Sequence, residues 1–380
     1  MKQYETYMKE CFELARQAEG KTSPNPLVGC IVLNKKGKII SNGFHAKCGE
    51  NHAERDALLK VTPEDCAYGT LIVNLEPCSH YGKTPPCADL IIEYGIKKVV
   101  IAMRDVNPVV SGNGIAKLKA AGIEVVEGIL EEEAKKLNEI FITNMTEKRT
   151  FVALKTAATL DGKIATSSGS SKWITSDAAR SEVKKIRARY DAILTSSATV
   201  IADNPTMEHN IKIILDRELK TDFENAKVYK SGNIFVFYDE NCQNNEILNS
   251  FFANPRNDKN SITFIKTPLI NEKLDIEFIL KKLYELKIMS VLVEAGGILN
   301  GSFLTYADKI YHFIAPKITG DNNSKSAFDG KKISQISESL NFRFDEIQTF
   351  EPDILVTYYP EKQSIINQLA RFCFAHNCQQ

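Results

Sequence analysis

His52-Ala53-Glu54, followed by Pro77-Cys78 and then by Cys87, are the most informative residues in the first half of the chain. One imidazole and two thiols can bind zinc, and three protein ligands leave the fourth tetrahedral position open for water. A catalytic site needs that open position, whereas a structural site is closed by four protein ligands. Zinc lowers the pKa of bound water from about 15.7 to about 7. The pattern therefore predicts one catalytic Zn²⁺ per chain, bound by His52, Cys78 and Cys87.

The glutamate of this motif has a chemical role of its own. In zinc deaminases a Glu two residues after the ligand His does not bind the metal but acts as the general acid and base. Glu54 occupies that position. We therefore predict that Glu54 takes a proton from the attacking water and returns it to the ring nitrogen and then to the leaving ammonia.

The sequence around the motif predicts where the ligands lie. The runs 27–33, 39–44 and 69–75 are rich in β-forming residues and predict strands. A helical run begins at His52, and residues 84–95 predict a second helix, with prolines in its first turn and a glycine at its end. The ligands would then lie at helix N-termini, which suit the negative charge of a bound hydroxide. The alternation of strands and helices predicts an α/β sandwich.

Other uses of these cysteines are less consistent with the sequence. A structural zinc site would need a fourth ligand, such as His45, Cys48 or His80, and would leave Glu54 without a role. A disulfide between Cys78 and Cys87 disagrees with the odd count of nine cysteines and with the lack of a signal peptide, which favour a reducing cytoplasm. The cluster around His376 is expected to be incidental, in an amphipathic helix at 364–374. The other cysteines are expected to be packed or solvated: Cys11, Cys30, Cys48, Cys66, Cys242, Cys373 and Cys378.

Longer stretches of the first half carry a resemblance to a known family. They read SPNPLVGC at 23–30, GFH at 43–45, GENHAE at 49–54 and LEPCSHYGKTPPC at 75–87. In these motifs the chain resembles the bifunctional riboflavin biosynthesis deaminase-reductases. Eight residues separate Cys78 from Cys87, whereas most nucleoside and nucleic-acid deaminases keep their two cysteines one helical turn apart. The resemblance extends from about residue 4 to residue 360.

The resemblance implies two enzymes in one chain. An N-terminal cytidine-deaminase-like α/β/α sandwich would deaminate a small phosphorylated pyrimidine, 2,5-diamino-6-(5-phosphoribosylamino)pyrimidin-4-one. A C-terminal dihydrofolate-reductase-like α/β domain would then reduce the ribosyl group of the product to a ribityl chain with NADPH. The family also implies a homo-oligomer.

Length and composition agree with this organisation. A chain of 380 residues is long enough for two domains with separate cores. We predict a deaminase domain at 1–146, a reductase domain at 150–360 and a tail at 361–380, with the boundary after a charged helix at 131–140. Lys+Arg and Asp+Glu both number 48, so no net charge attracts nucleic acid or an anionic membrane. No run approaches 18 apolar residues, so we expect no membrane-spanning helix and a cytoplasmic protein.

Three runs in the second half, 155–165, 171–176 and 192–205, resemble the reductase domain of the family. Trp173, the only tryptophan, has two interpretations that stay open: a core anchor, or a residue against the cofactor. No Gly-x-Gly-x-x-Gly run follows a strand, so a Rossmann site is not indicated. Instead, Gly296-Gly297 lies between a strand predicted at 290–293 and a helix predicted at 298–306. At such a turn backbone N–H groups can approach a pyrophosphate.

The resemblance also implies roles for single residues. In the deaminase half the residues around the base and phosphate are Asn25, His45, His80, Lys83, Asp105 and Asn107, of which the two histidines could instead orient the zinc ligands. In the reductase half the cofactor residues are Ala157, Trp173, Thr199, Asp203, Gly296, Gly297, Ile298, Leu299, Asn300, Gly301 and Ser302. The substrate residues are Ser171, Arg187, Met207, Asn210 and Glu294. Lys155 is the catalytic residue, and it shares the surroundings of the reacting sugar carbon with Asp203 and Glu294; which of the three supplies the proton stays open.

The chain departs from the family after Asp203-Asn204-Pro205. The family usually continues with a Leu and, three residues later, an Arg that grips the substrate phosphate, where this chain has Met207 and Asn210. An amide brings no charge, and a charge-assisted hydrogen bond is roughly twice as strong as a neutral one. We expect an active reductase with a weakened phosphate grip, in which Arg187 remains and Lys212 can reach in. A deaminase with a degenerate reductase half is the alternative. An RNA or nucleoside deaminase is opposed by the neutral charge and the second domain.

Overall fold

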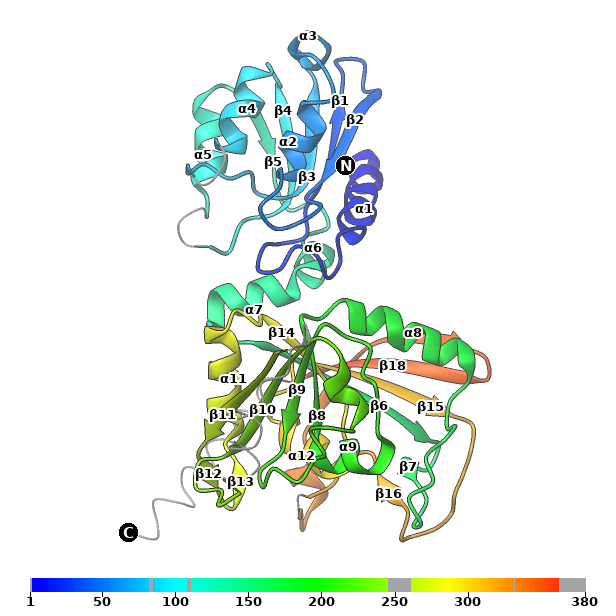
Figure 1. Cartoon of the computed structure of the whole chain (residues 1–380). Coiled ribbons are helices and arrows are strands. Elements are labelled where there is room, and N and C mark those ends of the chain that lie inside the picture. Colours follow the sequence, from blue (N-terminus) through cyan, green and yellow to red (C-terminus); the bar gives the residue numbers. More distant parts are fainter. Residues whose placement is uncertain (1, 82–84, 108–110, 245–260, 331, 362–380) are drawn as a thin grey trace. The chain divides into compact units, whose positions relative to one another are not determined.

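The computed structural model of the chain describes residues 2–81, 85–107, 111–244, 261–330 and 332–361. Lys83, the cluster around His376 and the helix expected at 364–374 lie outside the described residues. The chain divides into two compact units, Met1–Arg149 and Thr150–Gln380 (Figure 1). Each unit packs around a set of buried apolar side chains of its own.

The first unit is built on a five-stranded sheet ordered β2-β1-β3-β4-β5. β1 is antiparallel to β2 and β3, whereas β3, β4 and β5 are parallel. The strands are β1 (Gly29–Leu33), β2 (Ile39–Phe44), β3 (Thr70–Leu75), β4 (Lys98–Met103) and β5 (Glu124–Val126). The helices are α1 (Lys2–Arg16), α2 (Ala53–Leu58), α3 (Pro63–Cys66), α4 (Cys87–Glu93), α5 (Asn113–Ala120), α6 (Glu131–Leu137) and α7 (Glu139–Glu147).

Helices cover both faces of this sheet. A Cβ built on Gly29 would lie 2.0 Å from the carbonyl oxygen of Cys11 in α1, and one built on Gly43 would lie 2.5 Å from the backbone nitrogen of Ala57 in α2. Gly43 pairs with Cys30, the residue after Gly29, and successive strand residues point to opposite faces. α1 and α2 therefore pack on opposite sides, which is the α/β/α sandwich that the sequence predicts.

In the first unit, β3 and β4 lead into the two loops that hold several of the predicted site residues. β3 and β4 are parallel and almost wholly buried. The carboxyl end of β3 continues into Glu76, Pro77 and Cys78, and that of β4 continues into Asp105. Because the carboxyl ends of parallel strands meet at the same edge of a sheet, these two loops lie side by side.

The second unit is built on a nine-stranded sheet ordered β11-β10-β9-β8-β14-β6-β15-β18-β17. Neighbouring strands are parallel from β11 to β15, and β18 is antiparallel to both of its neighbours. The strands of this sheet are β6 (Phe151–Thr159), β8 (Ala192–Ser196), β9 (Ile211–Leu215), β10 (Asn233–Asp239), β11 (Ser261–Thr267), β14 (Ser290–Val293), β15 (Lys309–Ala315), β17 (Phe342–Phe350) and β18 (Asp353–Pro360).

Helices and short strands complete the second unit. The helices are α8 (Asp177–Ala188), α9 (Ser197–Asp203), α11 (Ile276–Glu285) and α12 (Gly297–Phe303), with 3₁₀ turns η1 (Lys227–Lys230) and η2 (Ile336–Glu338). The short strands are β7 (Lys163–Ala165), β12 (Leu269–Ile270), β13 (Lys273–Leu274) and β16 (Lys325–Ser326). One apolar cluster joins the sheet to α11 and α12, and a second joins it to α9 and η1. The strands β8 and β14 are buried because both faces of the sheet are covered.

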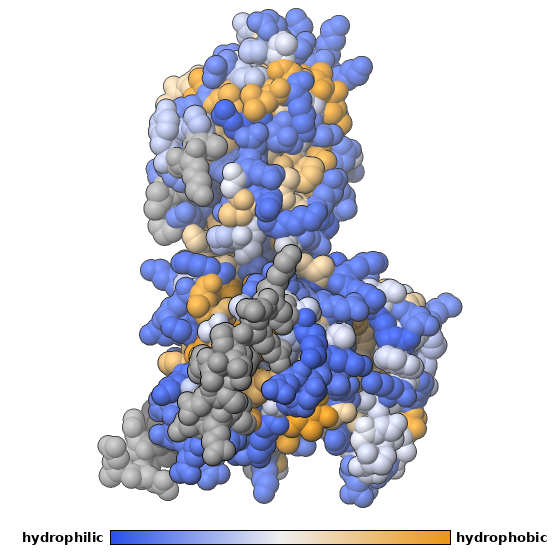
Figure 2. All heavy atoms as spheres, in the orientation of Figure 1, coloured by the Kyte–Doolittle hydropathy of each residue, from blue (hydrophilic) through white to orange (hydrophobic). Residues whose placement is uncertain are grey.

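Several predicted helices differ in extent from the observed ones. The helix expected at 131–140 is divided at Asn138 into α6 and α7. The side-chain amide of Asn138 is buried. It accepts a hydrogen bond from the N–H of Leu27 at 2.8 Å and donates one to the carbonyl of Leu27 at 3.1 Å, so Asn138 binds a neighbouring segment and the helix does not continue through it. Among the described residues no helix is both long and apolar enough to span a membrane. On the face shown in Figure 2, hydrophilic residues predominate and apolar ones occur in small groups.

Candidate active sites

The structure brings the three predicted zinc ligands together at the start of two helices. His52 is the N-cap of α2, and Cys87 is the first residue of α4. The Nδ1 atom of His52 lies 3.6 Å from the sulfur of Cys78 and 3.4 Å from that of Cys87. The ligand atoms of all three lie within 4.8 Å of one another, and within the described part of the chain no fourth His, Cys, Asp or Glu joins them. One nitrogen and two sulfurs fit a zinc ion with an open position.

The two cysteines of this site are free thiols. Their surroundings favour a thiolate at Cys78, whereas the hydrogen bond with Cys78 and burial raise the pKa of Cys87. The backbone N–H of Cys87 donates to the sulfur of Cys78 at 3.3 Å. The pKa of Cys78 is lowered to about 4, chiefly by a hydrogen bond from the Cys87 thiol and also by His52. The thiolate is the form that binds metals. The other described cysteines are also free: Cys11, Cys30, Cys48, Cys66 and Cys242.

Glu54 lies in the first turn of α2 and is buried, with 4% of its surface exposed. Burial raises the pKa of its carboxyl group to about 7, and the nearby sulfur of Cys78 adds to this effect. A carboxyl group that titrates near neutral pH can both accept and release a proton. The position and the pKa therefore suit an acid/base role.

His45 is buried beside His52, at 5.6 Å between ring centroids. Its Nδ1 atom lies 2.9 Å from the carbonyl oxygen of Asn51, and its Nε2 atom lies 3.0 Å from the side-chain nitrogen of Asn25. A carbonyl only accepts, so Nδ1 carries the proton and Nε2 accepts from the amide of Asn25. Burial lowers the pKa of His45, which keeps it neutral. Both ring nitrogens are thus engaged, and His45 orients Asn25.

The remaining predicted residues of the first unit lie on the two loops at the sheet edge. His80 is exposed and follows Cys78, whereas Asp105 and Asn107 follow β4. The N–H of Asn107 donates to the carboxylate of Asp105 at 2.8 Å. Burial, together with the negative charge of Glu76, raises the pKa of Asp105 to about 6.

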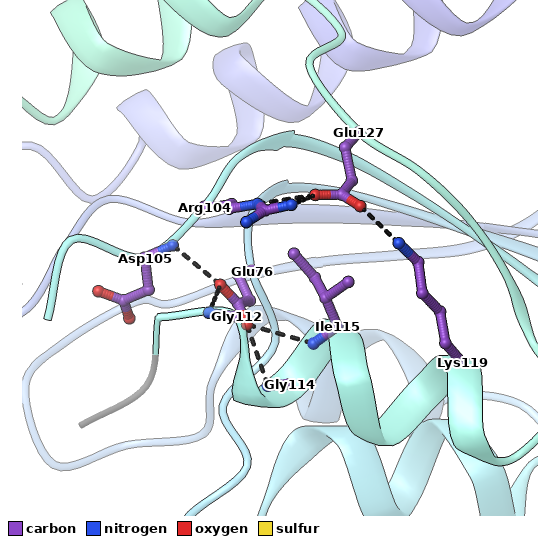
Figure 3. A network of polar contacts seen from close by, with 8 residues as sticks. All are labelled: Glu76, Arg104, Asp105, Gly112, Gly114, Ile115, Lys119 and Glu127. Carbon is purple, nitrogen blue, oxygen red and sulfur yellow. Dashed lines mark hydrogen bonds and ion pairs between the residues drawn. The ribbon is translucent and has the colours of Figure 1, made fainter. Parts of the chain in front are cut away.

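Glu76 is a residue of this region that the sequence reasoning did not single out. Its carboxylate is buried and accepts hydrogen bonds from four backbone N–H groups of the loop after β4 and the start of α5 (Figure 3). The only sequence signal was its place in the LEPC run at 75–78.

In the second unit three charged residues from distant parts of the chain form one cluster. Arg187 of α8 binds Glu294 through both carboxylate oxygens, at 2.6 and 2.8 Å. The ammonium of Lys155, on β6, lies 3.7 Å from the same carboxylate. Glu294 follows β14, the strand beside β6. Two cations and one anion give the cluster a net charge of +1.

The cluster shifts the pKa values of its members in a definite way. Burial lowers the pKa of Lys155; Glu294 raises it in part, and Arg187 lowers it. Burial alone would raise the pKa of Glu294, but the charges of Lys155 and Arg187 bring it below its usual value. Glu294 therefore stays ionised, while Lys155 is the member whose proton is more easily released.

The residues predicted to bind the cofactor divide into open and packed positions. Gly296 is the N-cap of α12, and a Cβ there would meet no atom within 4 Å. A Cβ on Gly297 would lie 2.1 Å from the carbonyl oxygen of Ser326, and one on Gly301 would lie 1.9 Å from that of Asp329. The amide of Asn300 is buried and donates to two carbonyls. The glycines at 297 and 301 thus allow a neighbouring segment to pack on α12.

Other predicted cofactor residues lie around the ends of strands. Ile298 is exposed, Leu299 is half-buried, and the hydroxyl of Ser302 donates to the carbonyl of Ile298 at 3.0 Å. Ala157 is half-buried two residues after Lys155, on the same face of β6. Thr199 is half-buried near the start of α9, and Asp203, its last residue, is exposed.

Trp173 is not a core anchor, so that interpretation is wrong. Its side chain is 64% exposed. The guanidinium carbon of Arg180 lies 4.3 Å from the centroid of its ring, and Lys317 donates to its carbonyl at 2.8 Å. Ser171, two residues earlier, is half-buried.

The loop that departs from the family lies beside α8. Met207 is buried in the apolar cluster with Val200, whereas Asn210 is exposed just before β9. Glu208 lies 3.8 Å from Lys184 of α8. The expectation that Lys212 can reach the substrate is wrong. Its ammonium is buried and donates to two carbonyls and a hydroxyl, those of Thr206, Val228 and Ser231, at 3.0 to 3.1 Å.

Known proteins resemble both units. The family model described as "Cytidine and deoxycytidylate deaminase zinc-binding region" matches residues 1–103, and that described as "RibD C-terminal domain" matches residues 150–356. The chain is 39% identical over 366 residues to the riboflavin biosynthesis protein RibD of Actinobacillus pleuropneumoniae, covering 93% of this chain and 94% of the relative. It is 41% identical over 362 residues to that of Aquifex aeolicus, covering 93% and 97%.

Solved structures agree over nearly the same length. A diaminohydroxyphosphoribosylaminopyrimidine deaminase/5-amino-6-(5-phosphoribosylamino)uracil reductase from Thermotoga maritima superimposes with a TM-score of 0.81 at 41% identity, covering 94% of this chain and 99% of that one. RibD of Acinetobacter baumannii gives 0.81 at 32% identity, covering 95% and 99%. A deaminase without a reductase unit is thereby excluded. The chain belongs to the RibD family of bifunctional riboflavin biosynthesis enzymes, with a zinc-binding deaminase unit and a pyrimidine reductase unit.

Proposed function

We propose that the first unit deaminates 2,5-diamino-6-(5-phosphoribosylamino)pyrimidin-4-one and that the second unit reduces the ribosyl group of the product to a ribityl chain with NADPH. The proposal rests chiefly on one observation, namely that each unit holds a separate reactive cluster. The first joins three zinc-type ligands to a buried glutamate. The second joins a buried lysine to an ionised glutamate.

In the deaminase, His52, Cys78 and Cys87 would hold the zinc ion. Bound there, zinc would supply a Lewis acid that activates water at neutral pH. Glu54 accepts a proton from the attacking water and passes it to the ring nitrogen. It then takes the proton of the hydroxyl group added to the ring carbon and supplies it to the departing ammonia. Its burial and its raised pKa support this role, because the carboxyl group must take up and release a proton twice in each turnover.

Asn25 is proposed to bind the edge of the pyrimidine ring. Because His45 accepts a hydrogen bond from its amide nitrogen, the side chain cannot flip, and its carbonyl oxygen keeps one direction. His45 therefore acts through Asn25. The other proposed substrate residues of this unit are His80, Lys83, Asp105 and Asn107.

In the reductase, Lys155 is proposed to supply the proton that accompanies hydride transfer. NADPH would supply the hydride. Burial makes the ammonium of Lys155 a stronger acid, while Glu294 attracts it by its opposite charge and is itself bound by Arg187. Asp203 stays a second candidate for the proton donor.

The cofactor is proposed to lie against the open positions of the second unit. Gly296, Ile298 and Trp173 offer surface that core packing does not occupy. Ala157, Thr199 and Asp203 are proposed contacts, together with Leu299 and Ser302. Gly297 and Gly301 would act through their backbone, because residues 326–329 occupy the space where their side chains would lie. Asn300 would also act through its backbone, because its side-chain amide already donates to the carbonyl of Ala327.

The substrate phosphate of the second reaction is proposed to lie near Ser171 and Arg187. The loop with Met207 and Asn210 would complete this site with fewer charges than the family usually provides. We also propose a cytoplasmic homo-oligomer, on the family resemblance alone; sedimentation of the purified protein checks the assembly.

The two half-reactions, assayed separately, test the proposed function. Purified protein should contain about one zinc per chain and release ammonia from the diaminopyrimidine substrate, and it should oxidise NADPH with the deaminated intermediate. Cys87→Ser should lose zinc and deamination together and keep NADPH oxidation. Zinc content that stays the same in Cys87→Ser would remove the proposed metal site, and no NADPH oxidation by the parent would favour a degenerate reductase unit.

A further inference from the structure

Glu76 lies between the two loops that form the deaminase edge of the first sheet. It follows β3 directly and precedes Pro77 and the ligand Cys78. Its own N–H donates to the carbonyl of Met103, the last residue of β4, at 3.0 Å. The side chain is 3% exposed. A buried carboxylate in this position has to be satisfied by hydrogen bonds.

Four backbone N–H groups donate hydrogen bonds to the Glu76 carboxylate. Oε1 accepts from Gly114 and Ile115, at 3.0 and 3.2 Å. Oε2 accepts from Gly112 at 2.9 Å and from Asp105 at 3.2 Å. Gly114 and Ile115 are in the first turn of α5, whose N-cap is a glycine without a capping side chain. Oε1 therefore caps α5, while Oε2 reaches beyond the helix to the start of the loop.

The reach to Asp105 separates this arrangement from an ordinary helix cap. A cap satisfies only the first N–H groups of its helix, whereas Glu76 ties both ends of the 105–112 connection to one carboxylate. Figure 3 shows the Asp105 carboxylate pointing away from Glu76, while its N–H faces the Glu76 oxygen. The N–H of Asn107 then bonds the Asp105 carboxylate. Glu76 thus holds the backbone of Asp105, from which this side chain extends.

A close backbone contact ties the same two loops together. A Cβ on Gly114 would lie 2.0 Å from the carbonyl oxygen of Pro77. The start of α5 therefore packs on the residue before Cys78. Two contacts therefore hold the loop after β4 to the turn that carries Cys78: the hydrogen bonds of Glu76 and the close packing of Gly114 on Pro77.

We propose that Glu76 is a positioning residue for deamination, which sets where Asp105 and Asn107 lie relative to the zinc-ligand turn. This inference rests on the proposed substrate-binding function of Asp105 and Asn107. Glu76 does not touch the substrate. It acts by keeping a substrate-binding loop and a metal-binding turn in one fixed relation, and its carboxylate is needed because each of its two oxygens accepts two hydrogen bonds.

Glu76→Gln tests the proposal on the full-length zinc enzyme. The amide is close in shape but turns one acceptor into a donor, which would face two N–H groups. We expect the KM for the diaminopyrimidine substrate to rise about tenfold, which corresponds to about 1.4 kcal/mol, with a smaller change in kcat. Zinc content and NADPH oxidation with the deaminated intermediate should stay the same. Glu76→Asp, which keeps the charge on a shorter side chain, should give a KM between those of Glu76→Gln and the parent.

Glu127→Gln is the matched control. Glu127 lies in the same region and binds Arg104 and Lys119, at 2.8 and 2.9 Å, through its carboxylate (Figure 3). It serves two side-chain cations, and removing its charge should leave the KM of deamination unchanged. If Glu127→Gln raised the KM of deamination as much as Glu76→Gln does, the effect at Glu76 would reflect only the loss of a negative charge, and the proposal would be overturned.

Amide hydrogen exchange gives a readout that does not depend on activity. In Glu76→Gln the amides of Asp105, Gly112, Gly114 and Ile115 should exchange faster, and in Glu127→Gln they should not. Faster exchange with an unchanged KM, or a loss of zinc and of NADPH oxidation in both Glu76 variants, would overturn the positioning role. If Asp105→Asn and Asn107→Ala leave the KM unchanged, the proposed substrate function of the loop fails, whatever Glu76 does to its exchange.

Discussion

The reactive residues of the first unit come from a short stretch of chain, whereas those of the second come from distant positions. His52, Cys78 and Cys87 stand at two helix starts and on the turn after β3. In the second unit Lys155 lies on β6, and Arg187 and Glu294 are 107 residues apart in sequence and 2.6 Å apart in space. The residues of the first site can therefore be recognised from a local sequence motif, whereas those of the second come together only in the folded sheet.

Each site contains a glutamate, and the two glutamates have opposite pKa shifts. Burial raises the pKa of Glu54 to about 7, with no guanidinium or ammonium group among its perturbing neighbours. Glu294 is half-buried, and Lys155 and Arg187 lower its pKa. One residue type is thus suited to proton transfer in one unit and to a fixed charge in the other, according to its partners.

Glu54→Gln tests the contrast most strongly. The amide keeps the shape of the side chain but cannot carry a proton, so deamination should fall by about 10²- to 10⁴-fold. Zinc content and NADPH oxidation with the deaminated intermediate should not change. The measurements are ammonia release, elemental analysis and absorbance at the NADPH band. Substantial deamination by this variant would transfer the proton role to another group.

Lys212→Met tests whether a buried lysine of the second unit is structural. The substitution leaves the carbonyls of Thr206 and Val228 without their donor, and the free energy of unfolding should fall by about 1–3 kcal/mol. Chemical denaturation measures this, with Lys220→Met as control because Lys220 is exposed and should change stability by less than about 0.5 kcal/mol. A stable Lys212→Met with a raised KM for the phosphorylated intermediate would return Lys212 to the substrate site.

Gly296→Val tests where the cofactor lies. Gly296 has a φ of −71°, which valine can adopt, and a Cβ there meets no protein atom. The variant should keep its stability and raise the KM for NADPH about tenfold, equal to about 1.4 kcal/mol. Gly297→Val should instead destabilise the unit, since its Cβ would meet Ser326. A Gly296→Val enzyme with the parent's NADPH KM would place the cofactor elsewhere.

A pair of substitutions gives signed pH shifts in the reductase. If Lys155 donates the proton, activity is lost as the pH rises through its pKa, which lies below 10.5. Glu294→Gln removes a charge that raises this pKa and should move the alkaline limb to lower pH. Arg187→Gln removes a charge that lowers it and should move the limb to higher pH. Rate–pH profiles at saturating substrate measure these shifts. If the alkaline limb moved in the same direction in both variants, Lys155 would not be the proton donor.

Asn210→Arg should have the smallest effect. Asn210 is exposed, and Glu208, two residues before it, lies 3.8 Å from Lys184 and acts electrostatically on Arg187. An added guanidinium at 210 should lower the KM for the phosphorylated intermediate a few-fold by a charge-assisted bond. Steady-state kinetics measure it, with Asn210→Gln as the uncharged control. An equal KM in both variants would mean that another residue already holds the phosphate.

The clustering of His52, Cys78 and Cys87 could be predicted because metal chemistry uses few residue types at restricted spacings. The roles of Glu76 and His45 could not, since both depend on backbone groups that only the fold brings near. Lys212 was misjudged because sequence does not reveal that its strand is buried on both faces. Asn138 divides a predicted helix for a similar reason, since it bonds Leu27, which is distant in sequence. Local sequence patterns predicted the helices and strands, whereas contacts between residues distant in sequence determined where these elements end.

The two packed glycines of α12 have a consequence for laboratory evolution of cofactor preference. Carbonyl oxygens lie about where Cβ atoms would stand at 297 and 301, at 2.1 and 1.9 Å. A mutant library that varies 296 to 302 uniformly would lose most members at those two sites before cofactor binding is ever selected. Diversity restricted to 296 and 298, which face open space or solvent, would retain folded proteins and test whether these two positions contact the cofactor.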